Sequence, residues 1–298
     1  FTPFRRRWKS VLSASESVLA DAPRDPNWVS LDGESQSFGR PVSGLIDESL
    51  ADLTTGNVMQ RWKAFSHGSL NQYGDLRDVP AKDGTSRLSA ALRFGVIHPA
   101  RLLNDLDPSS PHHDTFESEL AWRDFYADVL ARRPDSAWAN LDTRLNGIAV
   151  DTDRAARERF DVWCRGMTGF PIVDAGMRQL AATGWMHNRV RMIVASFLVK
   201  DLHLPWQWGA KWFMQRLVDG DLASNNHGWQ WAAGTGTDAA PYFRVFNPTA
   251  QADRWDASGE YQQKWIPELG SDRYPAPMVD HSEERKEALR RYEAARAG

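Results

Sequence analysis

The chain has 298 residues, enough for one large core or two ordinary domains, and its net charge of −3 is not that of a generally basic nucleic-acid-binding protein. Hydrophobic and charged fractions of 42% and 25% are typical of globular proteins, whereas 14 tryptophans against 6 tyrosines are unusual. Cys164 is the sole cysteine, which excludes an intramolecular disulfide and a thiolate metal cluster, and no apolar run has membrane-spanning length, so we expect a cytoplasmic protein without membrane or metal contacts.

Helical spacing of the apolar residues predicts an all-α chain. The basic segment 1–19 is expected to be helical, and 22–44, rich in Pro, Asp, Ser and Gly, to be a connector. Further helices are predicted at 57–65, at two short stretches within 88–103, and at 116–132, 153–164, 172–183, 185–202, 205–218 and 283–296, with a loop at 71–86. The expected division is a connector with an N-terminal helical and loop segment at 1–50, then one helical domain at 51–298.

Local signals predict where these helices begin and end. Asp114 is the expected cap of the helix at 116–132, Pro171 occupies a first-turn position, and Gly184 stands at a helix exit. The helices between 172 and 218 are separated by joints too short to hold strands. An alternation of strands and helices is therefore not expected.

Two motifs lack the context that their chemistry needs. Gly234, Gly236 and Ala239 match a dinucleotide-binding fingerprint, but no strand is predicted before them and no helix after them. We interpret them as part of a glycine-rich turn. His112 and His113 have no further ligand at metal-binding spacing, so a pair of loop residues is the better interpretation.

Basic and apolar side chains are interleaved on the helix predicted to begin at Trp185. Trp185, Asn188, Arg189 and Met192 stand at i, i+3, i+4 and i+7 and would share one face. Tryptophan and methionine at this spacing are usually core residues, but guanidinium groups are costly to bury without partners. With Arg191 among them, the pattern favours a site for an anionic, partly aromatic ligand.

Two carboxylates follow shortly after this helix. Asp219 and Asp221 could accept hydrogen bonds from ribose hydroxyls or from the N–H groups of a flat ring. They could equally cap the next helix or pair with Arg189 and Arg191. The residues by themselves leave these interpretations open.

Five tryptophans gather in the same part of the chain. Trp206, Trp208 and Trp212 lie on one predicted helix, and Trp229 and Trp231 follow. Packing is the default role of tryptophan. Trp229 and Trp231 have glycine and amide neighbours in the sequence instead of aliphatic ones, which favours a role in a binding site.

Longer blocks of sequence resemble the photolyase/cryptochrome family. They read GFPIVDAGMR at 169–178, TGWMHNRVRM at 183–192, DGDLASNNHGWQW at 219–231, PYFRVFNP at 241–248, DGTSRLS at 83–89 and ELAWRDFY at 119–126. The resemblance runs through nearly the whole chain and is strongest to the C-terminal FAD-binding domain of class I cyclobutane pyrimidine dimer (deoxyribodipyrimidine) photolyases. It implies a helical FAD- and DNA-binding catalytic domain at 51–298. The N-terminal α/β domain of the family would be absent from this chain, so no antenna chromophore is expected.

The resemblance implies a cofactor site for FAD. Its positions are Tyr73, Thr85, Ser86, Arg87, Leu88, Ser89, Arg123, Trp185, Asn188, Arg191, Asp219, Asp221 and Asn225. The hydroxyls, backbone amides and guanidinium at 85–89 suit a diphosphate. Arg191 and Asp219 would flank the flavin ring, and the Asn225 amide would donate to flavin N5 or accept from its N–H.

UV-damaged DNA is the partner that the resemblance implies. The corresponding positions are Arg77, Glu119, Trp122, Asn188, Arg189, Met192, Trp231, Arg244 and Gln251. Trp122 and Trp231 would pack on the flipped pyrimidine dimer, while Glu119 would hydrogen-bond to its base edges. The arginines would supply a local basic face.

The implied activity is light-driven repair of cyclobutane pyrimidine dimers by a monomeric enzyme, through an electron from photoexcited, reduced FAD. Asn225, Glu119, Trp229 and Trp206 are the implied catalytic and electron-transfer residues. The two tryptophans match the inner members of a family chain of three, but the segment 148–154, where the third is expected, contains none. Either the chain ends early, or a neighbour such as Trp163 or Trp208 replaces it.

Three alternatives remain at this point. A cryptochrome-like flavin photoreceptor is disfavoured by Asn225. A (6-4) photolyase would have a second histidine where this chain has Asn188. A tryptophan-rich helical scaffold would bind no flavin.

Overall fold

Helices follow one another without an intervening strand in the part of the chain that the computed structural model describes, residues 1–14, 53–237 and 244–297. The α-helices are α1 (Thr2–Ala14), α3 (Thr55–His67), α4 (Tyr73–Leu76), α5 (Ser89–Arg93), α6 (Pro99–Leu103), α7 (Pro111–Arg132), α8 (Arg154–Arg165), α9 (Pro171–Thr183), α10 (Asn188–Ser196), α11 (Trp206–Arg216), α12 (Leu222–Ala233), α13 (Pro248–Trp255), α14 (Glu260–Trp265) and α15 (His281–Ala297). Short 3-10 turns are η1 (Ser69–Gln72), η2 (Pro134–Ala137) and η3 (Thr143–Leu145), and a π-helical turn, η4 (Phe197–Asp201), continues α10. The expected all-α class is confirmed.

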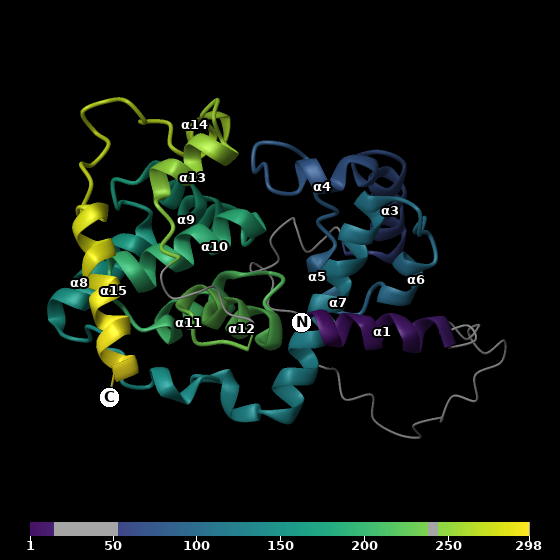
Figure 1. Cartoon of the computed structure of the whole chain (residues 1–298). Helices are drawn as coiled ribbons and strands as arrows, with labels where there is room; N and C mark the ends of the chain where they lie inside the picture. Colours follow the sequence, from purple (N-terminus) through teal and green to yellow (C-terminus); the bar gives the residue numbers. More distant parts are fainter. Residues whose placement is uncertain (15–52, 238–243, 298) are drawn as a thin grey trace, which may run out of the picture.

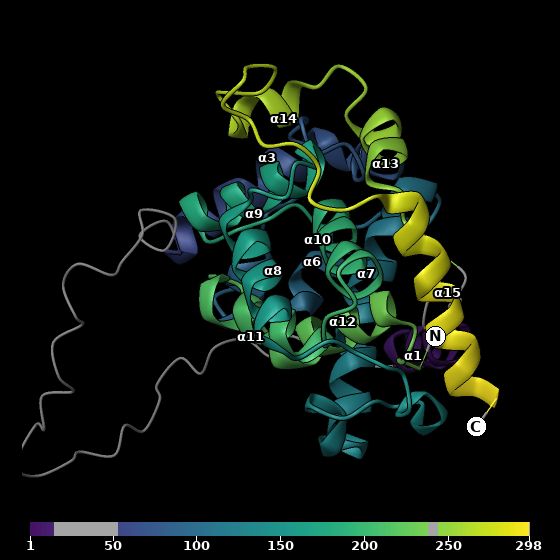
Figure 2. The same cartoon turned by 90° about the vertical axis from the view of Figure 1, so that its left-hand side faces the viewer.

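Two hydrophobic cores divide the described helices into two lobes. The first lobe, α3 to α6, packs Trp62, Phe65 and their neighbours against Phe116 of α7. The second lobe, α8 to α15, packs around Trp163 and Trp229. Figure 1 shows the first lobe in blue on one side and the second, in teal to yellow, on the other. Figure 2 views the molecule from the side of the second lobe, which lies in front of the first.

The long helix α7 joins the lobes. It packs against α4 and α1 and also against α12 of the second lobe. The helix begins where the Ser110 hydroxyl accepts a hydrogen bond from the His113 amide, so the expected Asp114 cap is wrong by four residues. Asp114 instead accepts hydrogen bonds from Arg5 and Lys9 of α1, both at 2.7 Å.

Several other expectations from the sequence need correction. Trp185 lies before α10, which begins at Asn188 behind a His187 cap, because Gly184 ends α9 at φ +63°. The loop predicted at 71–86 contains the short helix α4, and α13 and α14 were not predicted. The expected connector at 22–44 lies outside the described residues.

Close packing of α11 on α12 depends on one glycine. A Cβ atom added to Gly209 would lie 2.1 Å from the Trp229 ring, so only glycine leaves room for this indole. Trp229 is thereby buried between α11 and α12 with 2% of its surface exposed. Among the described residues no helix is both long and apolar enough to cross a bilayer.

Candidate functional site

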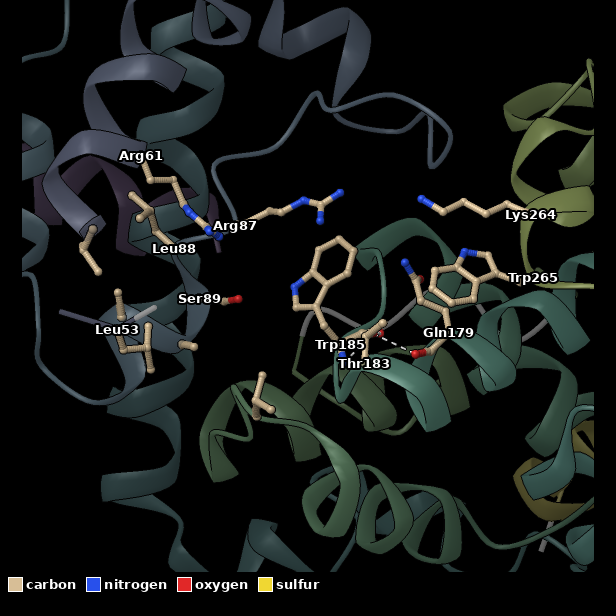
Figure 3. Close-up of a pocket in the computed structure, with 14 residues that line it drawn as sticks. Leu53, Arg61, Arg87, Leu88, Ser89, Gln179, Thr183, Trp185, Lys264 and Trp265 are labelled. Atoms are coloured by element: carbon tan, nitrogen blue, oxygen red, sulfur yellow. Dashed lines mark hydrogen bonds between the residues drawn. The ribbon is translucent and has the colours of Figure 1, made fainter. Parts of the chain in front are cut away.

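A cavity of about 320 Å³ lies between the two lobes, and we call it the Trp185 cavity. Figure 3 shows Arg61, Leu88 and Ser89 on its first-lobe side and Gln179 and Trp265 on its second-lobe side, with Trp185 between them. Its lining is mainly apolar, with the cations of Arg61, Arg87 and Lys264 along one side. This composition suits a ligand with a flat organic part and an anionic part.

The second cavity, of about 360 Å³, is the Thr85 cavity. It is more polar, and its lining is Arg61, Ala64, Phe65, Ser69, Asp83, Thr85, Ser86 and Arg87. Arg61 and Arg87 line both cavities, so two guanidinium groups stand where the cavities adjoin. Hydroxyls and guanidinium groups together are suitable donors for a phosphate group.

Arg87 is held in an uncommon backbone conformation. Its φ of +52° lies in the left-handed region, which costs a non-glycine residue free energy unless the surroundings impose it. The guanidinium carbon lies 4.9 Å from the centroid of the Trp185 ring, and Nε lies 3.3 Å from Asp83 Oδ1. These two contacts hold the arginine beside the ring that lines the Trp185 cavity.

The third cavity, of about 150 Å³, is the Asn225 cavity, between α10, α11 and α12. Arg191, Asp219 and Asn225 line it, together with Asn188, Met192, Asp221 and Trp229. Arg191 Nη2 donates to both carboxylate oxygens of Asp219, at 2.8 and 3.1 Å, and only 2% of the Asp219 side chain is exposed. The structure therefore brings together the residues that were expected to flank a flavin ring.

Asn225 uses both hydrogens of its amide within the protein. Its Nδ2 donates to the Ala210 carbonyl at 3.0 Å and to the Asn226 amide oxygen at 2.8 Å. The amide oxygen is the atom left to face a ligand. Of the two hydrogen bonds considered from the sequence, this geometry favours the one in which Asn225 accepts from a ligand N–H.

Asp221 caps α12, one of the roles left open by the sequence. Its Oδ1 accepts a hydrogen bond from the Ser224 amide at 2.8 Å, and Arg93 Nε lies 3.9 Å from its Oδ2. Arg123 of α7 donates to the Leu92 carbonyl at 3.3 Å. Asp221 and Arg123 thus both contact α5, the helix that follows the 85–87 segment of the Thr85 cavity in the sequence.

The expected DNA contacts on α4 and α7 are already engaged with one another. Arg77 Nη1 donates to Glu119 Oε1 at 2.7 Å, and its guanidinium carbon lies 5.3 Å from the Tyr73 ring centroid. Burial raises the pKa of Tyr73, so its phenol is neutral. Phe1 stacks on Trp122, with centroids 3.7 Å apart and an interplanar angle of 6°, so one face of this indole is covered in the structure.

Arg189 of α10 links the second lobe to Asp78 of the first lobe. Its Nη2 lies 2.7 Å from Asp78 Oδ2, and its guanidinium carbon lies 4.6 Å from the Trp255 ring centroid. Gln251 accepts a hydrogen bond from Trp255 Nε1 at 3.3 Å. Arg189 therefore pairs with Asp78 and not with Asp219 or Asp221.

The remaining expected DNA contacts lie on the second lobe. The half-buried Trp231 meets Phe246 edge to face, with centroids 6.3 Å apart. Arg244 is exposed, and its carbonyl accepts a hydrogen bond from the buried Lys200 at 2.7 Å. The preceding residues 238–243 lie outside the described part.

The aromatic contacts of Trp229 are with Trp163 and Phe213. Its ring lies 6.1 Å from Trp163 and 5.1 Å from Phe213, whereas no ring contact with Trp206 is found in the described chain. Trp163 in turn lies 5.7 Å from Phe160, which lies 5.5 Å from the half-buried Trp208. Trp206 donates its indole N–H to Asn140 at 2.9 Å.

His187 is a buried group without a complete set of partners. Its Nδ1 accepts the Arg189 amide N–H at 3.2 Å, so the neutral ring carries its proton on Nε2, which has no partner in the structure. Burial lowers the pKa of His187 to about 4. The ring therefore stays neutral near pH 7 and fixes the start of α10.

Sequence reasoning missed the residues that join elements distant in the chain. Arg61, Lys264 and Trp265 line the Trp185 cavity, and Asp78 and Trp255 hold Arg189. The high tryptophan content was the sole hint in the sequence, and it applied to Trp255 and Trp265. In the described residues no cluster of histidine, cysteine and carboxylate side chains is arranged to hold a metal ion.

A family model, related sequences and solved structures that resemble this chain all point to the same protein family. The model of the FAD binding domain of DNA photolyase matches residues 116–272. The deoxyribodipyrimidine photo-lyase of Salmonella typhimurium is 40% identical over 332 residues, which cover 100% of this chain and 68% of that protein. A class III photolyase structure from Agrobacterium tumefaciens superimposes with a TM-score of 0.80 at 37% identity, over 87% of this chain and 60% of that one.

A cryptochrome structure from Synechocystis is also similar, with a TM-score of 0.73 and 29% identity over 80% of this chain and 55% of that one. The chain thus spans about two thirds or less of the length of these relatives. The FAD expected from the sequence agrees with the family match, and the hydroxyls, guanidinium groups and paired charge of the three cavities fit its diphosphate and flavin. The chain belongs to the DNA photolyase family and contains its FAD-binding domain.

Proposed function

We propose that this chain carries out light-driven repair of cyclobutane pyrimidine dimers in DNA. The observation that carries the proposal is the buried Arg191–Asp219 pair beside Asn225, in a cavity that also contains Asn188 and Met192. Residues that the resemblance assigns to the cofactor and to the lesion thus line one cavity. The photo-lyase names of curated relatives at about 40% identity support the same reaction.

The residues of the two larger cavities would bind the cofactor. Thr85, Ser86 and Arg61 would hold the diphosphate in the Thr85 cavity, and Trp185 offers a flat face in the neighbouring cavity. Arg191, fixed by Asp219, would place a positive charge beside the flavin ring. The Asn225 oxygen would accept from an N–H on that ring, which favours the reduced form because that form has a proton on N5.

Held by these residues, reduced FAD would supply the photochemistry, namely one electron lent to the dimer in the light and returned once the two C–C bonds that join the pyrimidines have broken. Electrons and protons balance without any further reactant. The work of the protein is then to orient the dimer and exclude water. Asn188 and Met192 would contact it from α10, and Glu119 would accept from its base edges once Arg77 turns toward a phosphate.

The geometry also suggests how the flavin is kept reduced. We infer that an electron from a thiol or similar reductant in solution reaches Trp229 through Trp163, the tryptophan that its ring contacts, with Phe160 and Trp208 lying between Trp163 and the surface. This path would take the place of both the step through Trp206 and the outer tryptophan that is missing from 148–154. Trp206 remains a candidate for a parallel branch.

A repair assay tests the proposal. The FAD-loaded chain is mixed with an oligonucleotide containing one thymine dimer, and restored thymines are measured in the light and in the dark. Repair in the light alone is expected. If FAD and damaged DNA both bind but no dimer is split, the repair function is wrong and a cryptochrome-like photoreceptor becomes the better interpretation.

A further inference from the structure

A buried lysine lies in η4, the turn that continues α10. Lys200 is only 1% exposed, and its Nζ donates a hydrogen bond at 2.7 Å to the carbonyl oxygen of Arg244. The neighbouring carboxylate in the chain is directed elsewhere, because Asp201 Oδ1 lies 2.5 Å from His281 Nδ1 of α15. The hydrogen-bond partner of the Lys200 ammonium is therefore a backbone dipole of a distant segment.

Tyr292 of α15 lies beside the same ammonium. Its ring centroid is 5.8 Å from Lys200 Nζ, and its hydroxyl donates to the carbonyl oxygen of Ala233, the last residue of α12. The two side chains thus hold two main-chain carbonyl groups, one at the end of α12 and one at Arg244. We call Lys200 and Tyr292 with these two carbonyl groups the Lys200 anchor.

The segment held by the anchor packs against a tryptophan that the resemblance assigns to the lesion. The Phe246 amide N–H donates to Ser196 Oγ at 3.4 Å, so the chain from Arg244 onward is tied to α10 and η4 at two points. The Phe246 ring meets the Trp231 ring of α12 edge to face, with centroids 6.3 Å apart. The position of this segment therefore determines what packs beside Trp231.

The buried charge of Lys200 makes folding less favourable. Transfer of an ammonium group from water to the interior is unfavourable, and burial lowers the pKa of Lys200 from 10.5 to about 8. At neutral pH the folded chain therefore holds a proton that the unfolded chain binds more tightly. What the ammonium provides is a charge-assisted hydrogen bond to the Arg244 carbonyl, and such bonds are roughly twice as strong as neutral ones.

We propose that Lys200 is a positioning residue for the bound lesion, because its ammonium fixes the Arg244 carbonyl and, through Phe246, the ring of Trp231. The part that Trp231 and Arg244 have in DNA binding rests on the proposed function. Lys200 itself would touch neither DNA nor FAD, and would act through the chain that it holds. A neutral side chain of similar length should then preserve the core and lose the anchor.

Hydrogen exchange of the FAD-loaded chain measures the anchor without DNA. In Lys200→Met the Phe246 amide should exchange about tenfold faster than in the parent chain, because the hydrogen bond that holds its segment is lost. The unfolding free energy at pH 7 should stay equal or rise, since a buried charge has been removed. Lys286→Met on α15, whose side chain is 67% exposed, is the matched control and should change neither quantity.

Dark binding of a dimer-containing duplex and of its undamaged counterpart measures the consequence for DNA. Lys200→Met should raise the Kd of the dimer duplex about tenfold and reduce the preference for it, because Trp231 would pack on the dimer alone. Tyr292→Phe keeps the ring and loses the hydroxyl bonded to Ala233, so it should have a smaller effect in the same direction. A purely structural role of Lys200 would lower stability instead.

The pH dependence of the parent chain is a second test. Its preference for the dimer duplex should fall as the pH rises past 8, where Lys200 loses its proton, whereas the stability that Lys200 contributes should rise because only the unfolded chain still holds that proton. The charged and titratable groups around the ammonium are Asp201, which pairs with His281, and Arg244 and Tyr292. Burial raises the pKa of Asp201 to about 6 and that of Tyr292 above its ordinary value, so these two groups change charge mainly outside this range. Lys200→Arg, whose guanidinium stays charged, should keep the preference constant.

The results separate this inference from the proposed function. Unchanged exchange of the Phe246 amide in Lys200→Met, or an equal loss of preference in Lys286→Met, overturns the anchor even if repair is normal. If Lys200→Met does not retain FAD, the pH profiles of the parent chain and of Lys200→Arg decide, and two identical profiles overturn it. Faster exchange in a chain that splits no dimer supports the anchor and contradicts the repair function.

Discussion

Arg191 and Asp219 lie 2.8 Å apart, and the carboxylate is almost completely buried beneath the guanidinium group. The arginine also donates from Nε to the Met186 carbonyl at 2.8 Å, so its position is fixed before any ligand binds. Because the Arg191 side chain is already ordered, less conformational entropy is lost when a ligand binds.

Replacing Asp219 should therefore weaken cofactor binding more than a surface ion pair would suggest. In Asp219→Asn the guanidinium loses its charged partner, and removing one member of a buried pair costs about 2–5 kcal/mol. The Kd for FAD should rise at least about 30-fold. Flavin titration measures this, with Asp135→Asn as the control, because the Arg133–Asp135 pair is about half exposed. Equal affinities in both variants would contradict the assigned role.

The redox state of the flavin should respond to Asn225. In Asn225→Asp a carboxylate replaces the amide beside the proposed ring, and it also loses the donors now bound to Ala210 and Asn226. At alkaline pH, where the new group is ionised, the reduction potential of bound FAD should fall by on the order of 100 mV, because a nearby negative charge opposes electron uptake. Spectroelectrochemistry measures the shift. The exposed Asn146→Asp should show none.

Light-driven reduction of FAD should depend on Trp163. Phenylalanine keeps much of the packing against Phe213 and Trp229 but is far harder to oxidise, so Trp163→Phe should slow reduction at least about tenfold if the inferred path carries the electron. Transient absorption after a light flash measures the rate. Trp138→Phe, at a site 67% exposed, is the control. Unchanged reduction in a Trp163→Phe, Trp208→Phe double variant would rule the path out.

Stability should fall in acid because of His187. Burial lowers its pKa from 6.5 to about 4, so below pH 6.5 the unfolded chain takes up a proton that the folded chain refuses. The stabilisation is therefore complete above pH 6.5 and is lost as the pH falls toward 4, by about 3 kcal/mol in total. Urea unfolding at several pH values measures this contribution.

In His187→Gln that part of the pH dependence should disappear, whereas His67→Gln, at an exposed position on α3, should retain it. If the unfolding free energy of His187→Gln changes with pH between 4 and 6.5 as steeply as that of the parent chain, groups other than His187 cause the loss of stability in acid.

The sequence by itself determined the helical class, most helix bounds and the cofactor family. These follow from local information, such as the 3.6-residue spacing of apolar side chains, Pro171 at a first turn and Gly184 at a helix exit, and from long blocks that match the family. Local chemistry also identified Asp219, Asp221 and Arg191 as a cluster, although it left their pairing open.

Only the tertiary structure decided which side chains from distant parts of the chain come into contact. Asp78 and Arg189 are 111 residues apart, and nothing in either local sequence predicts their ion pair. The same holds for Trp255 on Arg189, for Phe1 on Trp122 and for Trp163 on Trp229, since these contacts arise where separate helices pack. Trp185 shows the reverse case, because helical spacing placed it on a helix whereas Gly184 turns the chain and directs its ring into the cavity between the lobes.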